Sequence, residues 1–278
     1  MSMPQFLQLK SMRLLWLLLA SACLAWMLAG CAAPGAGTQA GAAARDMVTD
    51  SDEPDERRRA RIRLELAVGY FEQGQTTVAL DELKQSLAAD PNFGPAHNLR
   101  GLVYMRLNDF RLADESFRRA LALNPADSNT KHNYGWMFCQ QGRYADAATY
   151  FSQALANPQY TERPKTLLIQ GLCHLRAGQP ALAEQSLTGS YELDAGNPIT
   201  GYNLALLLYQ RGEMARAQFY IRRINNSELA NAESLWLGVK VEHRIGNREA
   251  EQQLGVQLRR RFPQSPEAVL LERGAFND

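Results

Sequence analysis

Thiols and imidazoles are the side chains of this chain best suited to chemistry, and the sequence has four of each. The histidines, His97, His132, His174 and His243, stand apart from one another, in no H-E-x-x-H arrangement and beside no C-x-x-C pair. The sequence also contains no G-x-S-x-G motif and no glycine loop typical of phosphate binding. We therefore expect a protein that is not an enzyme and that binds no metal, other cofactor or small-molecule substrate.

Cys31 differs from the other cysteines because of the residues that precede it. Lys10 and Arg13 come before an uncharged apolar run, residues 14–30, which ends in the tetrapeptide Leu-Ala-Gly-Cys. A positive flank, a short apolar core and small residues form an export signal. A membrane-spanning helix is the alternative, and the run of 17 residues lies at the short limit of the roughly 17 to 25 that a span requires.

The tetrapeptide around Cys31 resembles the lipobox of bacterial lipoproteins. This resemblance implies that residues 1–30 are a signal peptide and that Cys31 becomes the acylated first residue, carrying fatty acids such as palmitate. Ala32 follows, where an Asp would be the usual signal for retention in the inner membrane. The resemblance thus implies a protein anchored by lipid in the outer membrane and facing the periplasm. A start at Met12 instead of Met1 would give the same mature chain.

The next segment, residues 31–53, is rich in Ala, Gly and small polar residues and poor in large apolar ones. Such a composition buries too little surface to offset the entropy lost on ordering. We expect a flexible tether with a reach of roughly 25 Å, followed by one folded domain over residues 54–278.

The folded part has a repeat of about 34 residues, carried by two series of small residues. The spacings within each series are 34, 34, 36, 34 and 33 residues. The first series lies midway through a predicted helix and comprises Ala67, Gly101, Gly135, Gly171, Ala205 and Gly238. The second lies twelve residues later and comprises Ala79, Ala113, Ala147, Ala183, Ala217 and Ala250. This period is typical of paired-helix solenoids, in which small residues permit close helix contacts.

The residues around the two series resemble the tetratricopeptide repeat. Its pattern of G-x-x-Y, A-x-x-x-F and a closing Pro is clearest in "GLVYMRLNDFRLADESFRRALALNP". The resemblance implies an all-α fold, a right-handed solenoid of six helix pairs with a short C-terminal capping helix. We place the units at about residues 60–93, 94–127, 128–161, 164–197, 198–230 and 231–264.

The charge balance argues against a nucleic-acid partner. Without Lys10 and Arg13 the chain has 28 basic and 29 acidic residues. The chain therefore lacks the excess of positive charge that binding to nucleic-acid phosphates requires. The arginines from Arg57 to Arg63 are interpreted as the solvated face of a first helix that begins near Pro54.

Two cysteines, Cys139 and Cys173, remain in the folded part once Cys23 and Cys31 are set aside. They lie on the first helices of neighbouring units, but at different positions of the repeat. We expect reduced, packed thiols, and a disulfide in an oxidising periplasm is the alternative.

The first helices of the six units are expected to line a concave groove that binds a protein partner. Positions three before, one after and four after each small residue share one helical face. Most of these side chains are apolar or aromatic. The side chain one position after each small residue is the middle one of the three, and it could equally pack between adjacent first helices. The candidate binding residues are Leu64, Val68, Phe71, Asn98, Leu102, Met105, His132, Trp136, Tyr202 and Tyr209. An amphipathic helix or an extended apolar segment would fit such a groove.

The segment "NYGWMFCQQGRY", residues 133–144, carries a closer resemblance. Together with the lipobox and the first units, it resembles the type IV pilus biogenesis and stability lipoproteins called PilW or PilF. That resemblance implies a pilotin, an outer-membrane lipoprotein that helps the secretin PilQ reach the outer membrane and multimerise, and hence a part in twitching motility. The alternative is a lipoprotein adaptor of the same architecture that organises or activates cell-wall enzymes, because a lipobox and a repeat array alone fit either function.

Overall fold

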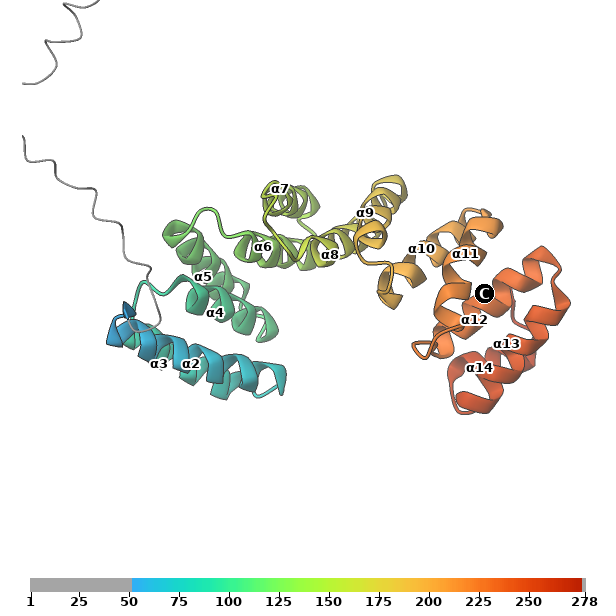
Figure 1. Ribbon diagram of the computed structural model, residues 1–278, viewed down its shortest axis with the longest axis horizontal. Coiled ribbons are helices and arrows are strands. Elements are labelled where there is room, and N and C mark those ends of the chain that lie inside the picture. Colours follow the sequence, from blue (N-terminus) through green and yellow to red (C-terminus); the bar gives the residue numbers. More distant parts are fainter. Residues whose placement is uncertain (1–51, 277–278) are drawn as a thin grey trace, which may run out of the picture. The chain divides into compact units, whose positions relative to one another are not determined.

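The computed structural model of this chain describes residues 52–276. These residues form thirteen helices, and no strand occurs within them. Twelve of the helices make six antiparallel pairs that follow one another along the chain, and the thirteenth closes the array (Figure 1). The expected all-α solenoid of six helix pairs with a short C-terminal helix is confirmed.

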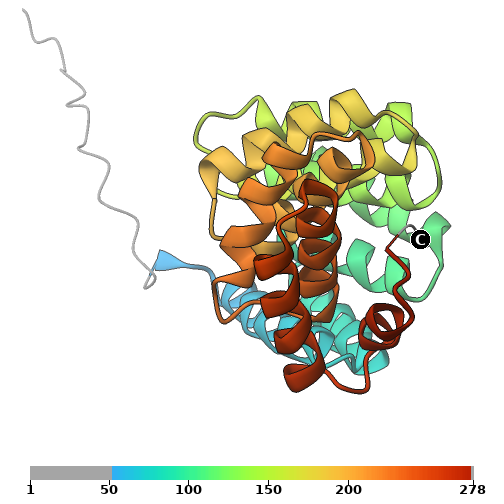
Figure 2. The same ribbon diagram turned by 90° about the vertical axis from the view of Figure 1, so that its right-hand side faces the viewer.

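Each pair has a first and a second helix of similar length. The first helices are α2 (Asp55–Glu72), α4 (Gly94–Arg106), α6 (Ser128–Gln140), α8 (Arg163–Arg176), α10 (Pro198–Gln210) and α12 (Ala232–Ile245). The second helices are α3 (Thr76–Ala89), α5 (Phe110–Leu123), α7 (Tyr144–Leu155), α9 (Pro180–Leu193), α11 (Met214–Asn225) and α13 (Arg248–Arg261). The last helix is α14 (Pro266–Arg273). Figure 2 shows that the successive helix pairs curve round and do not lie in one plane.

The turn inside each pair requires a left-handed backbone conformation. Gly74, with φ of 77°, and Gly142, with φ of 73°, supply it in the first and third pairs. The second pair has Asn108 at the equivalent place, with φ of 59°. Asparagine is the residue other than glycine that most readily adopts this conformation at a helix end, so the turn is conserved in shape without a glycine.

The small residues of the first helices lie where large side chains of the second helices pack. A Cβ atom on Gly101 would stand 2.5 Å from the ring of Phe117, and one on Gly171 would stand 2.7 Å from Leu187. Phe117 and Leu187 are completely buried, four residues beyond the alanine of their own helices. The repeating small residue is therefore needed to accommodate this large side chain, and not only to bring two backbones together.

The core runs along the array as a series of clusters. One cluster includes Met105, Phe117, Tyr134, Phe151 and Cys173 and thereby joins the second, third and fourth pairs. Most of a pair's buried side chains consequently contact its own partner helix or the next pair, as in other repeat architectures.

None of the helices within residues 52–276 is both long enough and apolar enough to cross a membrane. The predicted signal peptide (residues 1–30), Cys31 and most of the predicted tether lie outside the residues that the structure describes.

Candidate partner-binding surface

One pocket extends across four successive first helices, α2, α4, α6 and α8, and has a volume of about 550 Å³. We call it the first-helix pocket. Its lining combines apolar and aromatic side chains with amides and two cations, Arg106 and Lys165. The lining residues are Phe71, Leu102, Met105, Arg106, Asn108, His132, Asn133, Trp136, Gln140, Lys165 and Ile169.

Five of the ten residues proposed from the sequence come together in this pocket. They are Phe71, Leu102, Met105, His132 and Trp136. Because they belong to three different repeats, stacking of the pairs and not local sequence places them side by side.

Phe71 forms the α2 end of the pocket and is held by Arg106 of α4. The guanidinium carbon of Arg106 lies 3.7 Å from the centre of the Phe71 ring, and an Arg106 N–H donates to the Phe71 carbonyl. A cation over an aromatic face contributes on the order of 0.5 to 1 kcal/mol at an exposed site. The ring of Phe71 is thus half-buried and oriented before any partner arrives.

Two of the five pocket residues are more deeply buried than the sequence suggested. Met105 and His132 each have only 4% of their surface exposed. Met105 packs with Cys139 and Tyr134 in the core, so the expectation that it faces an open groove is wrong. The reason is that position four after the small residue turns toward the adjacent first helix once the pairs are stacked.

His132 belongs to a buried hydrogen-bonded network. Its Nδ1 lies 2.8 Å from the Thr166 hydroxyl, which lies 3.0 Å from the Tyr160 hydroxyl. Burial, with a smaller contribution from the charge of Lys165, lowers the pKa of His132 to about 4. The neutral His132 ring and the two hydroxyls therefore form one continuous chain of hydrogen bonds.

The low pKa of His132 predicts that the fold loses stability as the pH falls below about 6.5. Between about pH 6.5, the usual histidine pKa, and about pH 4, the unfolded chain binds a proton that the folded chain excludes, so lower pH favours unfolding. From the pKa of about 4, we expect His132 to account for a loss of about 2 to 3 kcal/mol between pH 7 and pH 4.5. Urea unfolding of wild type and His132→Gln at both values would measure it. Equal losses in the two proteins would contradict the assignment.

The other five proposed residues lie outside the first-helix pocket. Asn98 of α4 is engaged by Asn133, whose side-chain amide donates to the Asn98 oxygen over 3.0 Å. Leu64 and Val68 are on α2, away from the pocket lining, and Val68 is 37% exposed. Tyr202 and Tyr209 are on α10 in the fifth pair, and the structure does not bring them to this pocket.

Six lining residues were not among those proposed from the sequence. Four of these six stand at regular positions relative to the small residue of a first helix, and this regularity could have identified them. Asn133 and Ile169 stand two residues before the small residue of their helices, whereas Arg106 and Gln140 stand five after it. These two positions are seven residues apart and so lie on one helical face. The face that lines the pocket is therefore rotated relative to the one chosen from the sequence. Asn108 lies in a turn and Lys165 in the first turn of α8, where the pattern does not apply.

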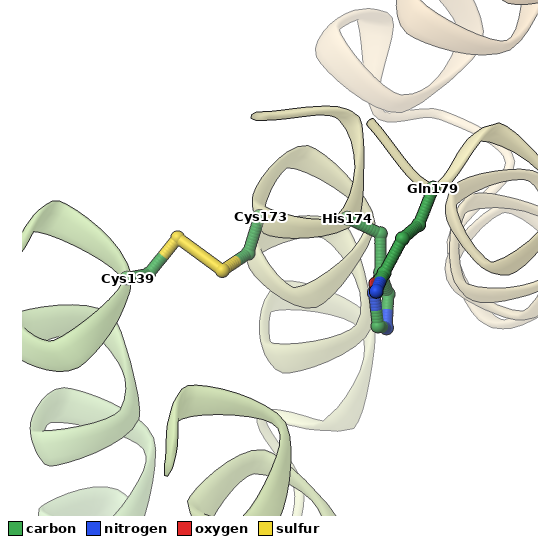
Figure 3. The surroundings of a disulfide bond; sticks show 4 residues. All are labelled: Cys139, Cys173, His174 and Gln179. Atoms are coloured by element: carbon green, nitrogen blue, oxygen red, sulfur yellow. A yellow bond between two sulfur atoms is a disulfide. The ribbon is translucent and has the colours of Figure 1, made fainter. Parts of the chain in front are cut away.

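Cys139 and Cys173 form a disulfide that joins α6 to α8, with 5.9 Å between the Cα atoms (Figure 3). The expectation of reduced thiols is wrong. The two cysteines stand at mismatched repeat positions, four and two residues after the small residue of their helices. Two positions two residues apart point to nearly opposite sides of a helix. Stacked parallel helices touch through opposite sides, so the mismatch is what lets the sulfurs meet.

The disulfide lies in the core directly behind the pocket. Both cysteines are 4% exposed, and the half-buried side chains of Leu102, Trp136 and Ile169 pack against the cluster that contains them. The covalent bond therefore ties together two of the helices that line the pocket.

Within residues 52–276 no group of three or more His, Cys, Asp or Glu side chains is placed to hold a metal ion. The first-helix pocket itself offers amides, cations and apolar surface. Such a lining suits recognition of a protein segment.

The Tetratricopeptide repeat family matches residues 64–128, 98–165 and 138–198. The type IV pilus assembly protein PilF of Pseudomonas aeruginosa is 32% identical over 213 residues, which cover 77% of this chain and 84% of PilF.

Two solved structures are also similar. A structure determined for the functional characterisation of P. aeruginosa PilF has a TM-score of 0.70 and 28% identity, covering 80% of this chain and 100% of that one. The crystal structure of PilW, described as a widely conserved type IV pilus biogenesis factor, has a TM-score of 0.67 and 30% identity, covering 76% of this chain and 97% of that one.

Proposed function

Because this chain belongs to the PilF and PilW family of type IV pilus biogenesis proteins built of tetratricopeptide repeats, we propose that it acts as a pilotin for the pilus secretin PilQ. Family membership supports a role in type IV pilus biogenesis, and the repeat fold implies protein partners. The finer steps proposed are binding of PilQ, its delivery to the outer membrane and its multimerisation there.

The observation that carries the proposal is the continuity of the first-helix pocket over four repeats. An extended or helical apolar segment could contact several first helices at once, with aromatic anchors at Phe71 and Trp136. Arg106 and Lys165 supply positive charge at the rim, and the lining contains no carboxylate. We therefore propose that the secretin segment is apolar with acidic residues beside it.

The disulfide supports export of the folded part. Disulfides form and persist in oxidising compartments such as the periplasm and are rare in the cytosol. We propose that residues 1–30 direct export, that Cys31 anchors the protein by acyl chains in the outer membrane, and that residues 31–53 tether the domain of residues 54–278 in the periplasm. More than one acyl chain on Cys31 would give stable anchoring where a single chain would not.

The anchor is tested by changing Cys31 to Ala. Without the thiol no acyl chain can be attached, so we expect the protein to incorporate no labelled palmitate and to be lost from the outer-membrane fraction. Ser21→Ala, within the predicted signal peptide, is the matched control and should behave as wild type. Undiminished palmitate labelling of Cys31→Ala would refute the lipoprotein assignment.

Deleting the gene tests the pilotin function and separates it from the adaptor alternative. A pilotin is needed for heat-stable secretin oligomers in the outer membrane, so these oligomers and surface pili should disappear together. If the oligomers persist while cell-wall synthesis or septation changes, an adaptor for cell-wall enzymes is the better assignment.

A further inference from the structure

The last described residues of the chain lie on the face of the fifth and sixth first helices. After α14 the backbone turns at Gly274, with φ of 64°, and brings Phe276 against α12. The Phe276 ring stacks on the His243 ring, with 4.1 Å between centres and 9° between planes. It also contacts Trp236, with 5.6 Å between ring centres. The Tyr209 hydroxyl of α10 donates to the Phe276 carbonyl over 3.3 Å.

These contacts have the form of peptide recognition. An aromatic side chain is held between two rings, a backbone carbonyl is held by a side-chain donor, and the orientation of His243 is set by Glu251 at 3.2 Å. The cations of Lys240 and Arg244 lie 5.4 and 5.6 Å from the centre of the Tyr209 ring. An acidic side chain next to the bound aromatic one would therefore meet positive charge.

The site is the counterpart of the first-helix pocket in the repeat. Trp236 stands two residues before Gly238 and His243 stands five after it. Asn133 and Gln140 hold the same two positions around Gly135, and both line the first-helix pocket. The chain's own C-terminal segment thus occupies, on α12, the helical face that is open on α6.

Phe276 packs against the core that ends the array but is not one of its buried members. Ala268 of α14 and Leu258 of α13 belong to the buried cluster and are at most 2% exposed. Phe276 itself is only half-buried, and residues 274–276 lie beyond the last helix. Displacing them would uncover Trp236 without unwinding a helix.

We infer that the α10–α12 face is a second peptide-docking site, held in the isolated protein by Phe276, and that its external ligand is an extended peptide with an aromatic side chain flanked by carboxylates. This inference does not depend on PilQ or on the first-helix pocket. The C-terminal segment acts as a tethered competitor, which keeps the site closed to weak ligands and yields it to a tighter one.

The size of the effect follows from the tether. A short flexible connection holds the segment at an effective concentration on the order of 1 mM. A free peptide with an intrinsic Kd on the order of 0.1 mM would bind the occupied site about tenfold more weakly than the open one. Removing the Phe276 ring should therefore make the free peptide bind about tenfold more tightly.

The test uses the full chain in detergent and a fluorescein-labelled peptide of residues 272–278, ERGAFND, with binding measured by anisotropy. We expect Phe276→Ala to bind this peptide about tenfold more tightly than wild type and to melt within about 2 °C of it. Adding His243→Ala, a side chain 43% exposed, should remove the gain. Phe219→Ala, which removes a ring 62% exposed on α11, is the matched control and should bind as wild type does.

A labelled peptide with alanine in place of its phenylalanine should bind none of the proteins. The inference is overturned if wild type and Phe276→Ala bind the peptide equally. It is also overturned if Phe276→Ala melts far lower and binds no peptide, since Phe276 would then be part of the cap, or if wild type is a dimer that Phe276→Ala dissociates, since the segment would then serve a second copy. A failure of PilQ to bind the protein would leave this result untouched.

Discussion

Cells carrying Phe71→Ser together with Trp136→Ser are expected to lose secretin oligomers and surface pili while keeping a folded protein. Both side chains line the first-helix pocket and are half-buried, so each has apolar surface left for a partner. Burying one large apolar side chain contributes on the order of 1.5 to 3 kcal/mol. Losing two would weaken secretin binding by two or more decades in Kd.

The matched control is Phe219→Ser combined with Val256→Ser. These side chains are 62% and 54% exposed on second helices, away from the pocket. The control should assemble secretin normally, and both double variants should keep wild-type helicity. Direct capture of purified PilQ by each full-length protein gives the affinity. Wild-type affinity in the Phe71 and Trp136 variant would show that the secretin binds elsewhere.

Met105 is a poor choice for this experiment even though it lines the same pocket. Its side chain is 96% buried and contacts the cluster that contains Cys139. A polar residue there would leave an unpaired group in the core, and the loss of function would report unfolding. Trp136 lies on the neighbouring first helix, α6, and is only half-buried, so a partner can reach its side chain.

The fold was predictable because every repeat carries two small residues at fixed positions, one in its first helix and one in its second. Gly101 and Phe117 show the reason. The first position must be small because the Phe117 ring fills the space beside it, and a Cβ atom on Gly101 would clash with that ring at 2.5 Å. Such a constraint acts between helices close in sequence, so it recurs with the period of the chain. Asn108 shows the limit, since it forms the same turn as Gly74 and Gly142 with a different residue.

The binding surface was harder to predict because it depends on how neighbouring pairs are rotated. The positions two before and five after the small residue, as in Asn133 and Gln140, lie on the open face, whereas Met105 turns inward. A shift of one residue turns a helical face by 100°, and the sequence period carries no information on this angle. The contact of Phe276 with His243 is still less visible, since it joins the chain end to a helix about thirty residues earlier.

Removing the Cys139–Cys173 disulfide is expected to lower the free energy of unfolding of the third and fourth repeats by about 3 to 4 kcal/mol, the loop entropy of a bond between residues 34 apart. For a domain of this size that corresponds to a fall of about 10 °C in the melting temperature. The measurement compares wild type with Cys139→Ala, Cys173→Ala by calorimetry. Dithiothreitol should lower the melting temperature of wild type and leave the variant unchanged.

Because the disulfide joins two neighbouring repeats, the effect of removing it should be confined largely to those repeats. Repeat arrays couple mainly neighbouring units, so hydrogen exchange should quicken in α6 and α8 before it does in α12 and α13. Because α6 and α8 carry Trp136, His132 and Ile169, the first-helix pocket should loosen with them. Secretin binding should then fall in the cysteine variant even below its melting temperature, while peptide binding at the α10–α12 face should not change. Equal loss at both sites would mean that the array unfolds as one unit and that the disulfide has no particular connection with the pocket.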